Sequence, residues 1–213
     1  MEITWYGLSC FRITERGKIS IVTDPYDPAI GLPKRTLKAD VVTISYDTPG
    51  HNFFKAVKVG RRVIDGPGEF EIGGVFITGV RRVSKVDKKN GEMQNTLFVL
   101  SFDGLTVAHL GNMATVPTQA QIEELGSVNI ALVPVGGGGA LNPSMAAEVI
   151  SLIEPSIVIP MHYKTGEKDS ELSTVEGFLK EMGVSDQAPL PSLNITKSSL
   201  TEETQVVVLT PAS

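Results

Sequence analysis

The sequence predicts an α+β protein in which two β-sheets pack face to face and helices lie outside them. Three observations favour this fold class. Strand patterns dominate the first half of the chain, strands alternate with helices in the second half, and 213 residues are enough for one large domain. We therefore expect a single domain over residues 1–213, with a core that needs no disulfide to hold it.

The first half consists of short runs rich in β-branched residues, separated by glycine and proline. Such runs favour strands, and the breaks between them favour turns. Strands are expected at residues 2–6, 9–14, 18–23, 40–45, 61–65, 69–72, 75–79, 95–101 and 105–110. The polar stretch 81–94 is expected to be an exposed loop or hairpin tip. It could serve as a lid, although a solvated turn is the more ordinary interpretation.

Helix-start signals appear in the second half. Thr118 with Gln121, and Ser173 with Glu176, have the spacing of capping boxes. Asn142 before Pro143 is typical of a helix N-terminus. Strands are expected between and after these helices, at residues 129–135, 156–160, 193–197 and 205–209.

Composition and charge narrow the classes of function. The net charge of −5 disfavours nucleic-acid binding, although basic clusters at residues 34–38 and 81–89 keep it from being excluded. No run approaches the roughly 18 apolar residues of a membrane span, and the chain starts without a signal-peptide pattern. The lone Cys10 excludes an internal disulfide and a zinc site built on several thiolates. These features predict a cytoplasmic protein without membrane contact.

Each of the three histidines lies near the end of a predicted strand or in the loop that follows one. Residues 45–51 read Ser-Tyr-Asp-Thr-Pro-Gly-His and end at His51. Residues 109–112 read His-Leu-Gly-Asn, and residues 159–163 read Ile-Pro-Met-His-Tyr. Imidazoles delivered by loops at strand ends are suited to metal binding, but a lone histidine is more often a hydrogen-bonded structural residue.

These segments resemble the motifs of the metallo-β-lactamase superfamily, whose signature loop reads Thr-His-x-His-x-Asp-His. On that frame, Tyr46 and Thr48 stand where the histidines of the first metal would be, and Gly50 stands where the aspartate would be. His51 alone matches. Hydroxyl groups are poor zinc ligands beside imidazole, so the first metal site is expected to be lost.

The other two segments resemble further motifs of the same superfamily. Asn112 takes the place of the aspartate in His-Leu-Gly-Asp, which bridges two metals, and its amide lacks the charge for that role. His162 matches the final histidine of Pro-x-His. Near the start of the chain, Leu8 takes the place of the histidine in Gly-His-Ser-Cys.

Additional blocks at residues 24–25, 66–71 and 134–137 are similar to a bacterial branch of Zn-dependent hydrolases related to ascorbate-6-phosphate lactonases. This resemblance spans the chain, and it implies a four-layer αββα sandwich of the metallo-β-lactamase type. The glycine run 136–139 lacks the residues of a nucleotide-binding loop, so a tight turn is expected there rather than an anion site.

The resemblance yields candidate site residues but no catalytic residue. The vestigial metal candidates are His51, His162 and Asn112. The residues expected to line the cleft are Leu8, Tyr46, Asp47, Thr48, Gly50, Glu69 and His109. For His51 and His109 the favoured interpretation remains a hydrogen-bonded structural histidine.

Two hypotheses about function remain open. In the first, the protein has lost most metal ligands and binds a small molecule or a protein, or serves as a structural subunit. In the second, one weakly held Zn or Mn at His51 and His162 supports hydrolysis of an ester, lactone or phosphoester. No tightly bound cofactor is expected, and homo-oligomer formation stays open.

Overall fold

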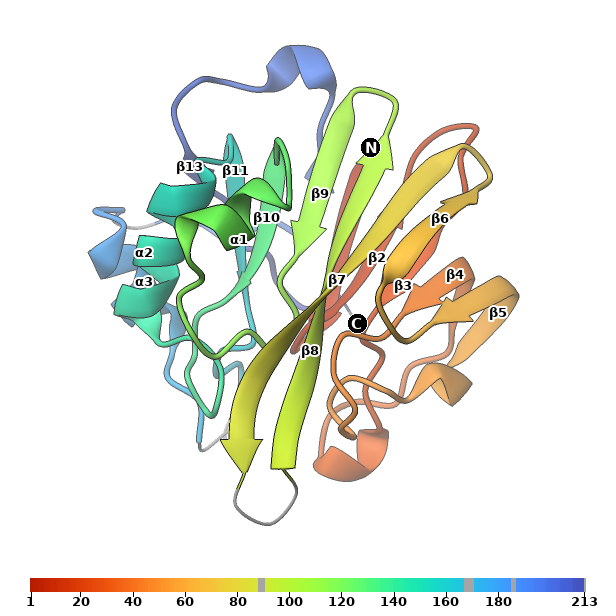
Figure 1. The fold of residues 1–213 in the computed structure, drawn as a ribbon, viewed down its shortest axis with the longest axis horizontal. Helices are drawn as coiled ribbons and strands as arrows, with labels where there is room; N and C mark the ends of the chain where they lie inside the picture. Colours follow the sequence, from red (N-terminus) through yellow and green to blue (C-terminus); the bar gives the residue numbers. More distant parts are fainter. Residues whose placement is uncertain (88–90, 167–170, 185–186, 213) are drawn as a thin grey trace.

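The structure is a computed structural model that describes residues 1–87, 91–166, 171–184 and 187–212. It contains two mixed β-sheets, which lie against each other with helices at one side (Figure 1). This architecture confirms the predicted α+β sandwich. None of the helices in the described ranges is both long and apolar enough to cross a membrane.

The first sheet is antiparallel on one side and parallel on the other. Its order is β12 (Leu193–Asn194), β1 (Glu2–Gly7), β2 (Cys10–Thr14), β3 (Ile21–Thr23), β4 (Leu37–Thr43) and β5 (Val57–Ile64). The pairs β3–β4 and β4–β5 are parallel, so the carboxyl ends of these three strands lie at one edge of the sheet.

The second sheet has the same mixed character. Its order is β13 (Gln205–Val206), β11 (Ile157–Met161), β10 (Ile130–Pro134), β9 (Leu105–His109), β8 (Gly91–Phe102), β7 (Val75–Asp87) and β6 (Gly68–Ile72). The strands β9, β10, β11 and β13 are parallel, and the remaining pairs are antiparallel. Both sheets therefore present a set of parallel carboxyl ends, where polar loops can meet.

The main core lies between the two sheets and continues under the helices. Trp5, Phe11, Phe98 and Ile130 are among its fully buried side chains. Alternate residues of β3 and β4, such as Val22, face a second apolar cluster on the outer side of the first sheet. Two buried faces explain why these strands read as continuous apolar runs.

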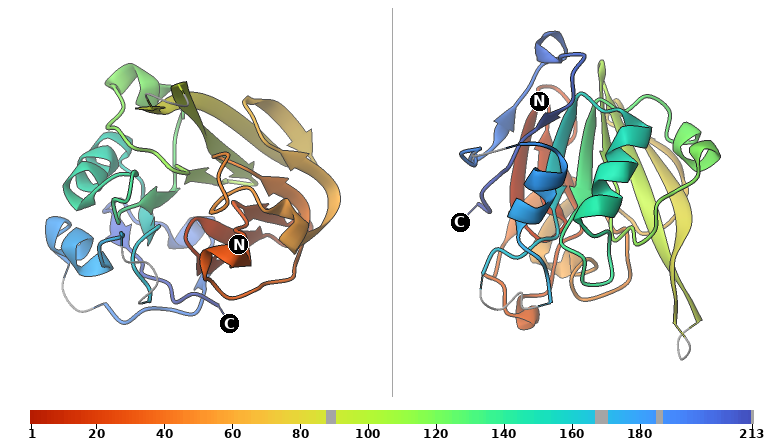
Figure 2. Two further views of the ribbon diagram at one scale, coloured as in Figure 1. Left: turned by 90° about the horizontal axis from the view of Figure 1, so that it is seen from below. Right: turned by 90° about the vertical axis from the view of Figure 1, so that its left-hand side faces the viewer.

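The α-helices cover the outer face of the second sheet (Figure 2). They are α1 (Gln119–Glu123), α2 (Pro143–Ile153) and α3 (Val175–Glu181). Thr118 and Asn142 cap the first two as predicted. α3 starts from Thr174 rather than Ser173, because the Ser173 N–H donates to the Gly136 carbonyl and holds Ser173 in the loop. The single-turn 3₁₀ helices are Pro28–Ile30, Phe54–Ala56 and Lys197–Ser199.

The prediction for residues 81–94 was right that the chain forms a hairpin here, but it placed too much of the segment in the turn. β7 continues to Asp87 and β8 starts at Gly91, so this segment extends the antiparallel ladder instead of forming a loop. The resulting two-stranded ribbon projects beyond the neighbouring strands (Figure 1). Backbone hydrogen bonds hold such a ribbon whatever its side chains are, so polar composition misled the prediction. Residues 88–90 of this segment lie outside the described residues.

Candidate functional site

The candidate site forms where the carboxyl ends of the two sheets meet. Asp24 follows β3, Ser45 follows β4, and His162 follows β11. His109 is the last residue of β9, and His51 comes from the loop after β4. The backbone also joins the sheets here, since the Thr96 N–H on β8 donates to the Ser45 carbonyl at 2.8 Å.

Asp24 is the fully buried centre of this site. Its Oδ1 accepts the Ser45 backbone N–H at 2.7 Å, and its Oδ2 accepts from the Ser45 hydroxyl and from His51 Nδ1 at 2.8 Å. Burial raises the pKa of Asp24, but the charge of His109 and the interactions with His51 and Ser45 outweigh it, so the pKa is lowered. The carboxylate is therefore ionised, and it holds the proton of His51 on Nδ1.

His51 and His162 lie together. Their rings are stacked with centroids 5.6 Å apart and planes inclined by 25°. His162 has a left-handed backbone with φ of 52°, and its N–H donates to the Leu8 carbonyl. Its Nδ1 is buried without a partner among the described residues. Burial lowers the pKa of His162 to about 3, with a further contribution from His51, so the imidazole is neutral near pH 7.

The neutral state of His162 makes the fold sensitive to acid. An unfolded histidine has a pKa of about 6.5, whereas the pKa of His162 is about 3. Between these values only the unfolded chain binds the proton. The free energy of unfolding should therefore fall as the pH decreases below about 6.5, by at most about 1.4 kcal/mol per unit from this group.

The variant His162→Asn tests this expectation, because asparagine tolerates the left-handed backbone. Urea denaturation with EDTA present, between about pH 7.5 and pH 5, should show a shallower loss of stability in the variant. The loss should not vanish, because burial also lowers the pKa of His109. Identical pH slopes in the two proteins would contradict the assignment.

Asn112 and His109 are held by polar contacts in the same region. The Asn112 N–H donates to Asn95 Oδ1 at 2.9 Å, and Asn95 Nδ2 donates to the Leu110 carbonyl at 3.0 Å. His109 is fully buried, with Nε2 2.9 Å from the Ser9 carbonyl oxygen and 3.9 Å from Asp24 Oδ2. The geometry gives His109 a role in joining β9 to the loop after β1.

Leu8 and Tyr46, at two of the positions where this chain departs from the superfamily motifs, are buried. A Cβ built on Gly50 would lie 3.6 Å from Leu8 Cδ1, so these two substituted positions are neighbours. Leu8 is 9% exposed and Tyr46 is 7% exposed. The Tyr46 ring meets the His51 ring edge-on at 5.7 Å, and its hydroxyl lies 3.1 Å from the sulfur of Met93.

Of the other candidates, Asp47 and Glu69 are exposed, and Thr48 shapes a turn through its carbonyl. The exposed Asp47 accepts a hydrogen bond from Asn52 Nδ2 at 2.7 Å. The carbonyl of Thr48 accepts the N–H groups of His51 and Asn52, which shapes the turn. Glu69 is exposed on the edge strand β6, which β7 and β8 separate from β9.

Sequence reasoning missed Asp24, Ser45 and Asn95 as members of the site. The signal for Asp24 was its place directly after a buried strand and before Pro25. Its backbone has a φ of 38°, which is uncommon for a residue other than glycine. Asn95 lies inside a strand and gave no such signal.

The described side chains do not fit a catalytic zinc ion. Such an ion usually has three protein ligands, and no group of three or more His, Cys, Asp or Glu in the described ranges is placed to hold a metal. Asp24 is close by, but donors from Ser45 and His51 already occupy both of its oxygens. His51 and His162 remain as the two imidazole ligands.

The sandwich and the polar loops at its strand ends define a protein of the metallo-β-lactamase fold class. A family model described as a beta-lactamase superfamily domain matches residues 2–162. The chain therefore belongs to the metallo-β-lactamase superfamily.

Several relatives share most of their length with this chain. A UPF0173 protein of Pyrococcus abyssi is 30% identical, over 85% of this chain and 90% of that protein. A UPF0173 metal-dependent hydrolase of Lysinibacillus sphaericus is 26% identical, over 78% of this chain and 86% of that protein.

Solved structures agree with this assignment. A Thermotoga maritima protein, whose description proposes a Zn-dependent hydrolase of the metallo-β-lactamase superfamily, is 38% identical with a TM-score of 0.80. The match covers 98% of this chain and 97% of that one. A metallo hydrolase from Ignicoccus hospitalis has a TM-score of 0.68 at 20% identity, over 92% and 99% of the two chains, and shows the shared fold alone.

Proposed function

We propose that this protein is a metallo-β-lactamase-fold member that has lost most of its metal ligands and does not catalyse efficient metal-dependent hydrolysis. The observation that carries the proposal is the ligand set: His51 and His162 lie together without a third group of suitable chemistry among the described residues. The packing of Leu8 beside Gly50 supports it further, because apolar contact replaces a charged ligand there.

In this proposal the cleft binds a small ligand or a protein partner, or the domain is a structural subunit. The buried Cys10 requires no oxidising compartment, which supports action in the cytoplasm. The acidic composition of the chain supports partners other than nucleic acid.

The alternative is a hydrolase that acts on an ester, lactone or phosphoester with one weakly held Zn or Mn at His51 and His162. Two observations favour it: relatives carry the name metal-dependent hydrolase, and His162 Nδ1 has no partner among the described residues. A metal held there would polarise a substrate oxygen or lower the pKa of a bound water.

Metal content separates the two functions. Purified protein, dialysed without chelator, is expected to contain well below one equivalent of zinc, manganese or iron by elemental analysis, because two imidazoles give too few ligands. Stoichiometric metal, lost together in His51→Ala and His162→Ala, would establish the alternative.

Restoring the missing ligands is the complementary test. A variant combining Tyr46→His, Thr48→His, Gly50→Asp and Asn112→Asp should bind close to stoichiometric zinc. The space beside Gly50 admits a Cβ at ordinary contact distance from Leu8. The same four changes with His51→Ala serve as the matched control and should bind less. Equal metal content in all these proteins would show that the motif residues do not occupy ligand positions.

A further inference from the structure

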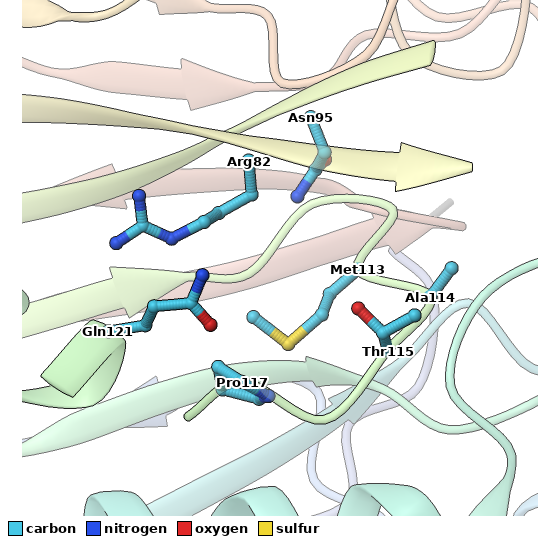
Figure 3. Close-up of a pocket in the computed structure, with 7 residues that line it drawn as sticks. All are labelled: Arg82, Asn95, Met113, Ala114, Thr115, Pro117 and Gln121. Atoms are coloured by element: carbon cyan, nitrogen blue, oxygen red, sulfur yellow. The ribbon is translucent and has the colours of Figure 1, made fainter. Parts of the chain in front are cut away.

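A small pocket lies outside the histidine site, between the ribbon of β7 and β8 and the segment that leads into α1. Its volume is about 170 Å³, which corresponds to roughly five or six water molecules at about 30 Å³ each. It is lined by Arg82, Asn95, Met113, Thr115, Pro117 and Gln121 (Figure 3).

Arg82 contributes a guanidinium group. Of the two nitrogens along its Nε–Nη2 edge, only one donates a hydrogen bond to a described residue. Its Nη1 donates to the Arg81 carbonyl at 2.9 Å, and its Nη2 donates to Glu124 Oε2 at 2.6 Å. Its Nε is buried without a partner in the described part of the chain. Nε and Nη of arginine form the fork that a carboxylate can bind with both oxygens. Glu124 thus meets this fork through a single hydrogen bond.

Gln121 supplies a second donor. Its Oε1 accepts the Thr118 N–H at 2.9 Å as part of the capping box of α1. This bond fixes which end of the amide is oxygen, so Nε2 carries N–H groups that face away from the helix start. Figure 3 shows the Gln121 amide nitrogen directed toward the Arg82 guanidinium.

The remaining walls include apolar atoms. The Met113 side chain is 5% exposed and lies beside Pro117 at the pocket (Figure 3). N–H donors on one side and a thioether with a proline ring on the other suit an acceptor that bears a short hydrocarbon chain.

We propose that this pocket binds a small carboxylate with a short aliphatic tail. The ligand carboxylate takes both positions of the Arg82 fork and displaces Glu124, and its tail lies against Met113 and Pro117. Displacement costs little, because the Glu124 side chain is 54% exposed and exposed ion pairs contribute little. Glu124 therefore competes with the ligand for the Arg82 guanidinium.

Asn95 connects the pocket with the histidine site. It lines the pocket, and its side chain also holds the Asn112 N–H and the Leu110 carbonyl. A ligand in the pocket would therefore lie next to the loop that carries Asn112, although the proposal does not depend on the function of that loop.

The proposal is tested by titrating the protein with butyrate while the methyl signal of Met113 is followed by NMR. Met113→Leu assigns the signal, and EDTA removes any carboxylate binding through a metal. Saturable shifts are expected with butyrate but not with butyramide, which has the same shape without the charge. Absence of a saturable shift in both the unaltered protein and Glu124→Gln would overturn the proposal.

Two substitutions should move the affinity in opposite directions. Glu124→Gln removes the internal competitor and should tighten butyrate binding severalfold. Arg82→Lys keeps the charge but loses the fork, and should weaken binding by at least about tenfold. Arg81→Lys is the matched control, because the neighbouring arginine lies outside the pocket, and should leave the affinity unchanged. Equal affinities in the Glu124→Gln, Arg82→Lys and unaltered proteins would overturn the proposal, even if butyrate bound.

Discussion

Replacing Gly136 with alanine is expected to lower the free energy of unfolding by at least about 3 kcal/mol, at the upper end of overpacking effects. A Cβ at Gly136 would overlap the His162 carbonyl oxygen and would lie 2.7 Å from Tyr163 Cα. Both neighbours are backbone atoms, which cannot rotate away. The Gly136 N–H also donates to the same carbonyl at 3.1 Å, and the Gly136 carbonyl accepts the Ser173 N–H.

The adjacent glycine offers a matched control for this prediction. Gly137 has a φ of 72°, and among the described residues other than its chain neighbours no heavy atom lies within 4 Å of its virtual Cβ. Gly137→Ala should therefore cost only the conformational penalty of about 1–2 kcal/mol. Urea denaturation of both variants measures the difference. Equal losses would mean that backbone conformation, rather than contact with His162, explains the glycine run.

Replacing Asp24 with asparagine is expected to cost about 3–5 kcal/mol of folding free energy, the range for breaking a buried charged pair. The carboxylate accepts three hydrogen bonds, from the Ser45 N–H, the Ser45 hydroxyl and His51 Nδ1. An asparagine amide would turn an N–H₂ group toward one of these donors. His51 would then lose the partner that fixes its ring.

The pH dependence gives a second readout for Asp24. Its pKa in the folded protein is lowered. Its contribution is therefore complete above the unfolded value of about 3.9 and is lost as the pH falls through the folded value. Below about pH 4 the parent protein and Asp24→Asn should converge in stability.

Asp40→Asn is the comparison for this substitution. Asp40 also accepts the Ser20 N–H and hydroxyl, but its side chain is 37% exposed, so water can replace the lost bonds. Its effect on stability should be clearly smaller. A loss in Asp40→Asn as large as that in Asp24→Asn would show that burial at the centre of the site is not what matters.

Much of the fold could be predicted because its strands carry strong local signals. Runs such as Ile130–Pro134 are apolar and include β-branched residues, and the capping residues Thr118 and Asn142 mark two helices. The parallel pairing of β3, β4 and β5 could not be predicted in the same way. In α/β proteins a helix usually joins parallel strands, whereas here the connections contain only the 3₁₀ turns Pro28–Ile30 and Phe54–Ala56.

The site could be predicted only in part, because some of its contacts also depend on how the strands pair. His51 and His162 follow strands and match superfamily motifs, and the structure places their rings side by side. The role of Asp24 depends on contacts between the ends of β3 and β4 and the loop of His51. Such contacts arise from strand pairing, which composition and spacing do not reveal.

The pairing of β1 with β12 has a consequence for synthesis of the chain. Glu2 lies opposite Asn194 in the first sheet, so β1 gains its outer neighbour from a segment that is made much later. The ribosome covers the most recently made residues, and translation proceeds at about 5–20 residues per second. The edge of β1 therefore stays open until residues 193–194 have left the ribosome, and only then can this sheet be completed.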